Sequence, residues 1–132
     1  MTYPISDMIV RIKNASKAGR SNLTMPYSRM KENICSILQK EGFIGNYSVK
    51  EEENITKKAL EITLKYTERK EPVILDIKVT STPGLRIYKK VKEIKPYKNG
   101  LGVEIFSTSY GIITDFECRG KNIGGLSLLK VM

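Results

Sequence analysis

Residues 60–66 read Leu-Glu-Ile-Thr-Leu-Lys-Tyr, in which apolar and polar side chains alternate one by one. This period of two is typical of a strand with one buried face and one exposed face. The stretch 43–49 alternates more loosely, and the acidic run Glu51–Asn54 between the two stretches predicts a turn. We therefore expect a β-hairpin over residues 43–66.

Two segments upstream of this hairpin have the spacing of helices. Apolar residues recur every three to four positions over residues 5–15, and Gly19 follows as a C-terminal cap. A second helix is expected from about Ser28. Between the helices, residues 23–25 predict a short strand that ends at Pro26. The first half of the chain is therefore expected to fold as α-β-α-β-β.

The second half of the chain is expected to be mostly β. Residues 67–72 are polar and charged, and they predict a connector between an N-terminal lobe, residues 1–66, and a C-terminal lobe, residues 73–132. Alternation predicts strands within 73–79, 85–88, 101–106 and 126–131, a loop at 107–111, a short helix around 91–94 and another capped at 114–115. The expected fold class is α+β: an α-β-α-β-β lobe packed against a β-rich lobe with a short helix.

The composition removes several classes of function. The chain has 132 residues, 40% of them hydrophobic, which is enough for a core. It has no His, which excludes His-dependent catalysis and His-ligated metal sites. Its two cysteines, Cys35 and Cys118, lie far apart with no CxxC pattern, so we expect neither a zinc site nor a disulfide, and Cys35 is predicted to be a core residue. We expect no enzyme activity, metal, cofactor, small-molecule substrate or membrane partner.

Basic residues are concentrated in two stretches. The chain carries 23 Lys+Arg against 14 Asp+Glu, a net charge of +9. Six of these cations lie in residues 8–31, which contain no acid, and six lie in residues 86–98, with Glu93 as the one acid. Two such clusters favour a polyanionic partner, most commonly nucleic acid. Tyr88 in the second cluster is suited to stacking on a base, although packing between strands explains its spacing equally well.

Ser107-Thr108-Ser109 is the second feature that suggests a binding surface. Small hydroxyl side chains at the end of a strand allow close approach, and each hydroxyl both donates and accepts hydrogen bonds. Base edges and ribose 2′-hydroxyls in the shallow minor groove of RNA need this combination. A plain turn is the alternative reading of the same tripeptide, and no neighbouring base activates it as a nucleophile.

Several motifs together resemble a known family. They are residues 7–15 (Asp-Met-Ile-Val-Arg-Ile-Lys-Asn-Ala), Leu64-Lys65-Tyr66, residues 83–88 (Pro-Gly-Leu-Arg-Ile-Tyr), Gly100-Leu101-Gly102, residues 107–115 (Ser-Thr-Ser-Tyr-Gly-Ile-Ile-Thr-Asp) and Gly124-Gly125. Their order and spacing across essentially the whole chain resemble the bacterial small-subunit ribosomal protein numbered eight.

The resemblance implies a structural constituent of the small ribosomal subunit. It implies a primary binder of the central domain of small-subunit ribosomal RNA, needed for assembly, in the cytoplasm or in an organelle. Neighbouring small-subunit proteins, the fifth among them, are the implied protein partners. A free translational repressor or RNA chaperone, which binds a messenger-RNA mimic of the same site, is the alternative.

The candidate RNA-binding residues combine the family's hydroxyl loop with the basic clusters. They are Ser107, Thr108, Ser109, Tyr110, Arg86, Tyr88, Lys89, Lys92, Gly124, Gly125, Arg11, Asn14 and Lys31. The C-terminal lobe is expected to carry recognition. Two residues depart from the family pattern. Tyr110 stands where a basic residue is usual, which exchanges a phosphate contact for stacking, and Leu126 stands where Glu is usual, which removes that carboxylate's hydrogen bonds.

Overall fold

The computed structural model describes residues 4–51 and 58–132. The acidic turn expected at Glu51–Asn54 therefore lies outside the described residues, apart from Glu51. The chain divides into a unit of Asp7–Ile74 and a unit of Leu75–Met132 together with residues 4–6. The mixture of helices and antiparallel sheets confirms the α+β fold class. The role of residues 67–72 as a connector between independent lobes stays a prediction.

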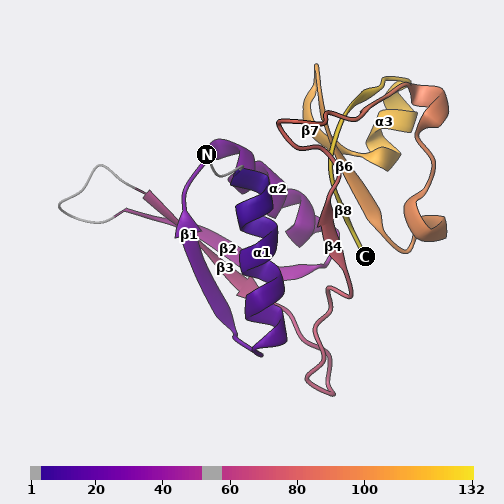
Figure 1. The fold of residues 1–132 in the computed structure, drawn as a ribbon. Coiled ribbons are helices and arrows are strands. Elements are labelled where there is room, and N and C mark those ends of the chain that lie inside the picture. The colour runs from indigo at the N-terminus through magenta and orange to yellow at the C-terminus, as the bar shows by residue number, and fades with distance from the viewer. Residues whose placement is uncertain (1–3, 52–57) are drawn as a thin grey trace. The chain divides into compact units, whose positions relative to one another are not determined.

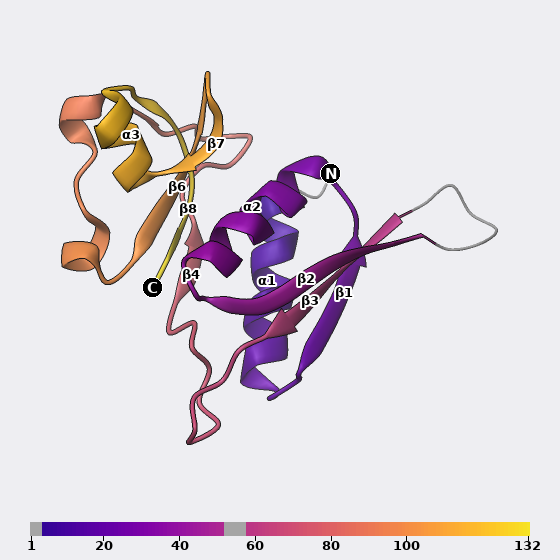
Figure 2. The same ribbon diagram turned by 180° about the vertical axis from the view of Figure 1, so that it is seen from behind.

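The first unit contains a three-stranded antiparallel sheet with two helices. Its elements are α1 (Pro4–Lys17), β1 (Asn22–Pro26), α2 (Arg29–Lys40), β2 (Ile44–Glu51) and β3 (Lys58–Leu64), which confirms the predicted order α-β-α-β-β. The strand order is β1-β3-β2. In the two opposite views α1 crosses a single face of this sheet (Figures 1 and 2). The alternating apolar residues of β3 are buried, as their period of two predicts.

The end of α1 is fixed by a complete Schellman motif. Gly19 adopts φ +71°, and its N–H donates to the Ser16 carbonyl at 3.2 Å. The N–H of the next residue, Arg20, donates to the Ala15 carbonyl at 3.0 Å. These two bonds satisfy carbonyls that the helix itself leaves unpaired, so the predicted cap at Gly19 is confirmed.

Pro26 lies inside β1, whereas the sequence predicts that the strand ends before it. Tyr27 N–H donates to the Lys58 carbonyl at 3.1 Å, and Leu64 N–H donates to the Ser21 carbonyl at 2.9 Å. Since hydrogen-bonded positions alternate along an antiparallel pair, the backbone groups of Pro26 point to the open edge of β1. The missing N–H of proline therefore costs no ladder hydrogen bond, and the strand continues through it.

The second unit is built around β8. Its elements are β4 (Ile77–Val79), β5 (Tyr88–Lys89), the 3-10 turns η1 (Val91–Glu93) and η2 (Tyr97–Gly100), β6 (Val103–Thr108), β7 (Gly111–Thr114), α3 (Asp115–Lys121) and β8 (Gly125–Val131). The antiparallel strand order is β4-β8-β6-β7, and β5 also pairs with β8. Phe106, Ile113 and Cys118 form a buried cluster with Ile94, in which α3 covers one face of β6 and β7.

The structure corrects three sequence predictions in this unit. Ser107 and Thr108 belong to β6, whereas the sequence predicts a loop over residues 107–111. Strand β7 is not predicted, because Ile112 and Ile113 are adjacent apolar residues that face opposite sides of the sheet and show no alternation. The predicted strand at 73–79 is reduced to β4. Of the predicted strand at 85–88 only Tyr88 lies in a strand, β5, which also includes Lys89. The cap at Thr114 is confirmed, since its hydroxyl accepts from the Glu117 N–H at 3.2 Å.

Both thiols are buried, as the sequence predicts for Cys35. Burial raises the pKa of the Cys35 thiol to about 12, with a smaller effect from Glu32. Burial and then Asp115 raise the pKa of the Cys118 thiol to about 11. The reactive thiolate form is disfavoured in both cases.

We expect neither cysteine to react with a maleimide at pH 7–8 in the folded protein, because each thiol is inaccessible and protonated. Both should react fully in a denaturant, where their pKa values return to about 8.5. Mass spectrometry of labelled protein with and without denaturant measures this. Rapid labelling of the folded protein would contradict the buried positions.

Candidate nucleic-acid interface

The hydroxyl tripeptide spans the end of β6 and the tight turn into β7. Ser109 and Tyr110 form the turn, and Gly111 begins β7 with φ +97°, which glycine adopts without strain. The Thr108 hydroxyl closes this turn, since it donates to the Gly111 carbonyl at 2.9 Å and accepts from the Tyr110 N–H at 3.1 Å. Its proton is therefore already engaged, and one lone pair remains for a ligand.

The hydroxyls of Ser107 and Ser109 are available to a ligand. Ser107 is partly buried and Ser109 is exposed. Among the described residues, no hydrogen bond to another protein group involves either hydroxyl. Each can therefore donate one hydrogen bond and accept others, as groups that read base edges or 2′-hydroxyls must do.

Gly124 and Gly125 allow three strands to approach closely. A Cβ on Gly124 would lie 2.3 Å from the Lys89 carbonyl oxygen. A Cβ on Gly125 would lie 2.7 Å from the Ser107 carbonyl oxygen and from the Thr108 Cγ2. Both distances are below van der Waals contact, so side chains here would push β5 and β6 away from β8. The glycine pair thus brings two predicted regions of the site together.

A row of side chains crosses the sheet at this point. Leu126 of β8 pairs with Tyr88 of β5 on one side and with Ser107 of β6 on the other, and Ser107 in turn pairs with Ile112 of β7. Directly paired residues share a face of the sheet, so these four side chains form one surface. Tyr88 is 68% exposed. The opposite face carries Phe106 and is covered by α3.

Lys89 is held in an ion pair below this row. Its Nζ lies 3.0 Å from Glu104 Oε2, and the Glu104 residue is only 2% exposed. Ser127 Oγ also donates to the same carboxylate at 2.5 Å, and it lies 2.6 Å from Thr80 Oγ1. The ammonium thus compensates a buried carboxylate and ties β5 to β6 and β8.

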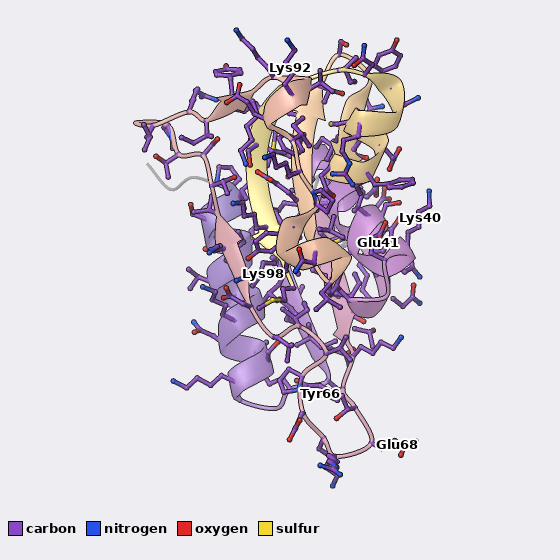
Figure 3. The ribbon with its side chains drawn as sticks, turned by 90° about the vertical axis from the view of Figure 1, so that its right-hand side faces the viewer. Lys40, Glu41, Tyr66, Glu68, Lys92 and Lys98 are labelled. Atoms are coloured by element: carbon purple, nitrogen blue, oxygen red, sulfur yellow. The ribbon has the colours of Figure 1, made fainter. Side chains whose placement is uncertain are left out.

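Other cations of the second basic cluster remain available to a ligand. Arg86 and Lys92 are exposed and form no ion pair within the described residues. Figure 3 shows Lys92 on η1 and Lys98 on η2, both in the segment that joins β5 to β6. Tyr110 at the hairpin tip is 64% exposed, and the Lys121 Nζ lies 5.0 Å from the centre of its ring. This cation–π contact places a positive charge beside the Tyr110 ring.

The remaining candidates belong to the Asp7–Ile74 unit. Arg11 and Asn14 are exposed on α1, and Arg11 Nε lies 2.9 Å from Asp7 Oδ2. Lys31 is only 5% exposed, and its Nζ donates to the Pro26 carbonyl at 3.1 Å. In this conformation the Lys31 ammonium stabilises the start of α2 against β1 and is not presented to a phosphate.

Sequence reasoning missed the groups that support the site. Glu104 and Ser127 hold Lys89, and Lys121 lies over Tyr110, yet none of the three was singled out. The signal for Glu104 was present, because it is a lone acid among the apolar residues of β6. Such a residue in a strand of a sheet covered by a helix needs a buried cationic or hydroxyl partner.

No cluster of three metal-ligating side chains occurs in the described ranges, 4–51 and 58–132. No helix in the part of the chain that the structure describes is long and apolar enough to cross a membrane.

The model of the family described as ribosomal protein S8 matches residues 3–132. The chain belongs to the ribosomal protein S8 family. Relatives called small ribosomal subunit protein uS8 are 45% identical over 131 residues in Syntrophus aciditrophicus and 41% identical over 131 residues in Rickettsia bellii. Each match covers 99% of this chain and 98% of the relative. A third, from Salinispora arenicola, is 44% identical over 126 residues, covering 95% of this chain and 93% of the relative.

Membership of the S8 family confirms the resemblance found in the sequence motifs. Members of this family are structural and non-enzymatic, so the chain is not an enzyme. The family does not by itself assign the thirteen candidate residues, whose part in RNA binding stays a prediction.

The glycine pair yields a stability prediction. Gly125→Ala should destabilise the protein by about 1–3 kcal/mol, because the added methyl overlaps the Ser107 carbonyl and the Thr108 methyl. Gly84→Ala is the matched control, since a Cβ there meets no atom within 4 Å. Urea unfolding of both variants measures the difference. Equal stabilities would show that β8 and β6 tolerate a wider separation.

Proposed function

We propose that the protein is a constituent of the small ribosomal subunit and binds small-subunit ribosomal RNA in the cytoplasm. The observation that carries this function is the row of Tyr88, Leu126 and Ser107 across three strands, with the available hydroxyl of Ser109 at the neighbouring turn. Membership of the S8 family and the relatives' printed name, small ribosomal subunit protein, support the same function.

Different groups of this surface make different kinds of contact with the RNA. Hydroxyls at Ser107 and Ser109 bond to base edges or 2′-hydroxyls, which distinguishes one RNA element from another. Arg86 and Lys92 bind phosphates, which adds affinity without sequence information. Tyr88 and Tyr110 present exposed rings for stacking on bases or riboses.

Lys89 positions this surface from within. Its ammonium is neutralised by Glu104, so it adds little to phosphate attraction. What it contributes is the placement of β5, and hence of Tyr88, beside β8. Leu126 presents an aliphatic side chain between Tyr88 and Ser107, where the family's usual Glu would present a carboxylate. An aliphatic group packs against a ribose or a base face.

The finer details of the family's function extend this proposal. The bound element lies in the central domain of the RNA, binding occurs early in assembly, recognition belongs to residues 73–132, and the fifth small-subunit protein is a neighbour. Chemical footprinting of full-length small-subunit RNA with and without the protein tests the location of the element. Co-sedimentation with small subunits at high salt tests the incorporation, because a free repressor would not remain bound.

The first RNA prediction concerns salt dependence. Affinity should fall with salt on a log–log slope of roughly 3–7, because each neutralised phosphate adds about 0.9 and only part of the net charge faces the RNA. Lys92→Ala should lower the slope by about one. Lys89→Ala should leave the slope nearly unchanged and instead reduce stability, because it leaves Glu104 buried without its cation. Filter-binding titrations from 50 to 300 mM salt measure both slopes. A slope near zero for the unaltered protein would exclude a polyanion partner.

The second RNA prediction separates specific recognition from phosphate attraction. Ser109→Ala should weaken specific binding by on the order of 1–3 kcal/mol, about five- to hundredfold, because it removes a hydroxyl from a desolvated contact. The salt slope and the affinity for unrelated duplex RNA should not change, since no cation is lost. Gel-shift titrations measure all three quantities.

Two further variants control this test. Ser36→Ala removes an exposed hydroxyl from α2 and should have no effect. Thr108→Ala should lose both binding and turn order, since its hydroxyl holds the hairpin, while Thr108→Ser should restore most of the affinity. If Ser107→Ala and Ser109→Ala both bind normally, the tripeptide is only a turn.

A further inference from the structure

A groove of about 430 Å³ opens within the Asp7–Ile74 unit, between the second half of α1 and strand β1. The volume lies in the range of small-ligand sites. Its apolar lining consists of Ala15, Ala18 and Leu23, and the cations Arg11 and Arg20 also line it. The groove thus combines apolar and cationic groups.

Arg20 is fixed in place at this groove by its backbone. Its N–H donates to the Ala15 carbonyl at 3.0 Å, and its own carbonyl accepts from the Tyr66 hydroxyl at 2.5 Å. Within residues 4–51 and 58–132 its guanidinium forms no ion pair. Arg11 forms an ion pair with Asp7, but the Arg11 side chain remains 45% exposed. The whole stretch 8–31 contains no acid to compensate these charges.

The open edge of β1 adds hydrogen-bonding groups to the groove. Because odd-numbered residues of β1 bond to β3, the backbone N–H and carbonyl of Thr24 point to the open edge. Thr24 and the exposed amide side chain of Asn14 both line the groove. These groups offer donors and acceptors side by side, which is what the edge of a nucleobase requires.

We propose that this groove binds one unpaired nucleotide of the RNA held by the protein, with its phosphate at Arg20 and Arg11 and its base against the apolar lining. The assignment rests on the proposed function, because the ligand is part of the same RNA. An acidic peptide that adds a strand to β1 fits less well. Pro26 has no N–H to donate at the open edge, and its carbonyl already accepts from Lys31 Nζ.

Two substitutions test the arginine charge and the apolar lining of the groove separately, in full-length protein bound to full-length small-subunit RNA. Arg20→Gln should reduce affinity about tenfold and lower the salt slope by about one. Ala18→Phe fills the groove from the exposed residue that follows α1, and it should reduce affinity with an unchanged slope. Lys17→Gln, a neighbouring cation that does not line the groove, controls for charge, and Ala18→Ser controls for substitution at that position. Thermal unfolding confirms that each variant is folded.

Crosslinking identifies the occupant directly. Asn14→Cys places a thiol in the groove, and the buried Cys35 and Cys118 leave it the reactive one for an azidophenacyl group. Irradiation of the complex should attach the protein to an unpaired nucleotide, mapped by reverse transcription. Ala18→Phe in the same protein should abolish that crosslink, and Ser109→Ala at saturating RNA should not. The same label at Ser36→Cys on α2 should not mark that nucleotide.

The outcomes separate this site from the proposed function. Failure of the unaltered protein to bind ribosomal RNA would overturn both. Normal binding by Arg20→Gln and Ala18→Phe, with loss in Ser109→Ala, would overturn the groove alone. A crosslink in assembled subunits to a protein, with none to RNA, would show that an acidic peptide occupies the groove and would also overturn the nucleotide.

Discussion

Close backbone approach at Gly124 and Gly125 is the constraint on which the C-terminal unit depends. Strand β8 pairs with β4, β5 and β6, and near its start it lies between β5 and β6 with no room for a Cβ. A larger residue there would separate the strands that carry Tyr88 and Ser107. The surface proposed to read RNA is therefore produced by the absence of two side chains as much as by the presence of others.

A buried carboxylate is the second condition for this arrangement. Glu104 would be costly in the sheet without partners, and Lys89 and Ser127 supply them from β5 and β8. The three strands joined by the glycines are thus joined again through side chains. Because removing any one partner leaves a polar group unpaired, this network discourages shifted strand registers.

The sequence predicted the elements whose signals are local. The period of two in residues 60–66, the cap at Gly19 and the cap at Thr114 all follow from neighbouring residues. The structure confirms both caps, and it confirms the strand as far as Leu64, where β3 ends. Strand β7 was missed because two adjacent isoleucines show no period. The inclusion of Pro26 in β1 depends on which edge its nitrogen faces, and this is set by pairing with a strand more than thirty residues away.

The same distinction holds for the candidate site. The motifs that resemble the family include Ser107, Tyr88 and the glycine pair. The strand pairing brings these residues together. Charge counting also selected Lys31 and Lys89, because a sequence shows that a cation exists but not whether a buried acceptor engages it. The roles of Glu104 and Ser127 depend on contacts between strands that are distant in the sequence. The groove beside Arg20 depends on how the chain turns back after α1, so only the three-dimensional arrangement shows it.

The position of β8 in the sheet has a consequence for how the protein folds during its synthesis. The central strand is made after β4, β5 and β6, so each of those strands must wait for a partner that has not yet been synthesised. In the first unit β1 also waits for β3, but all three strands are complete by residue 64. During translation the two units should therefore mature in sequence. A nascent chain can hold a finished first unit while the surface proposed to read RNA does not yet exist.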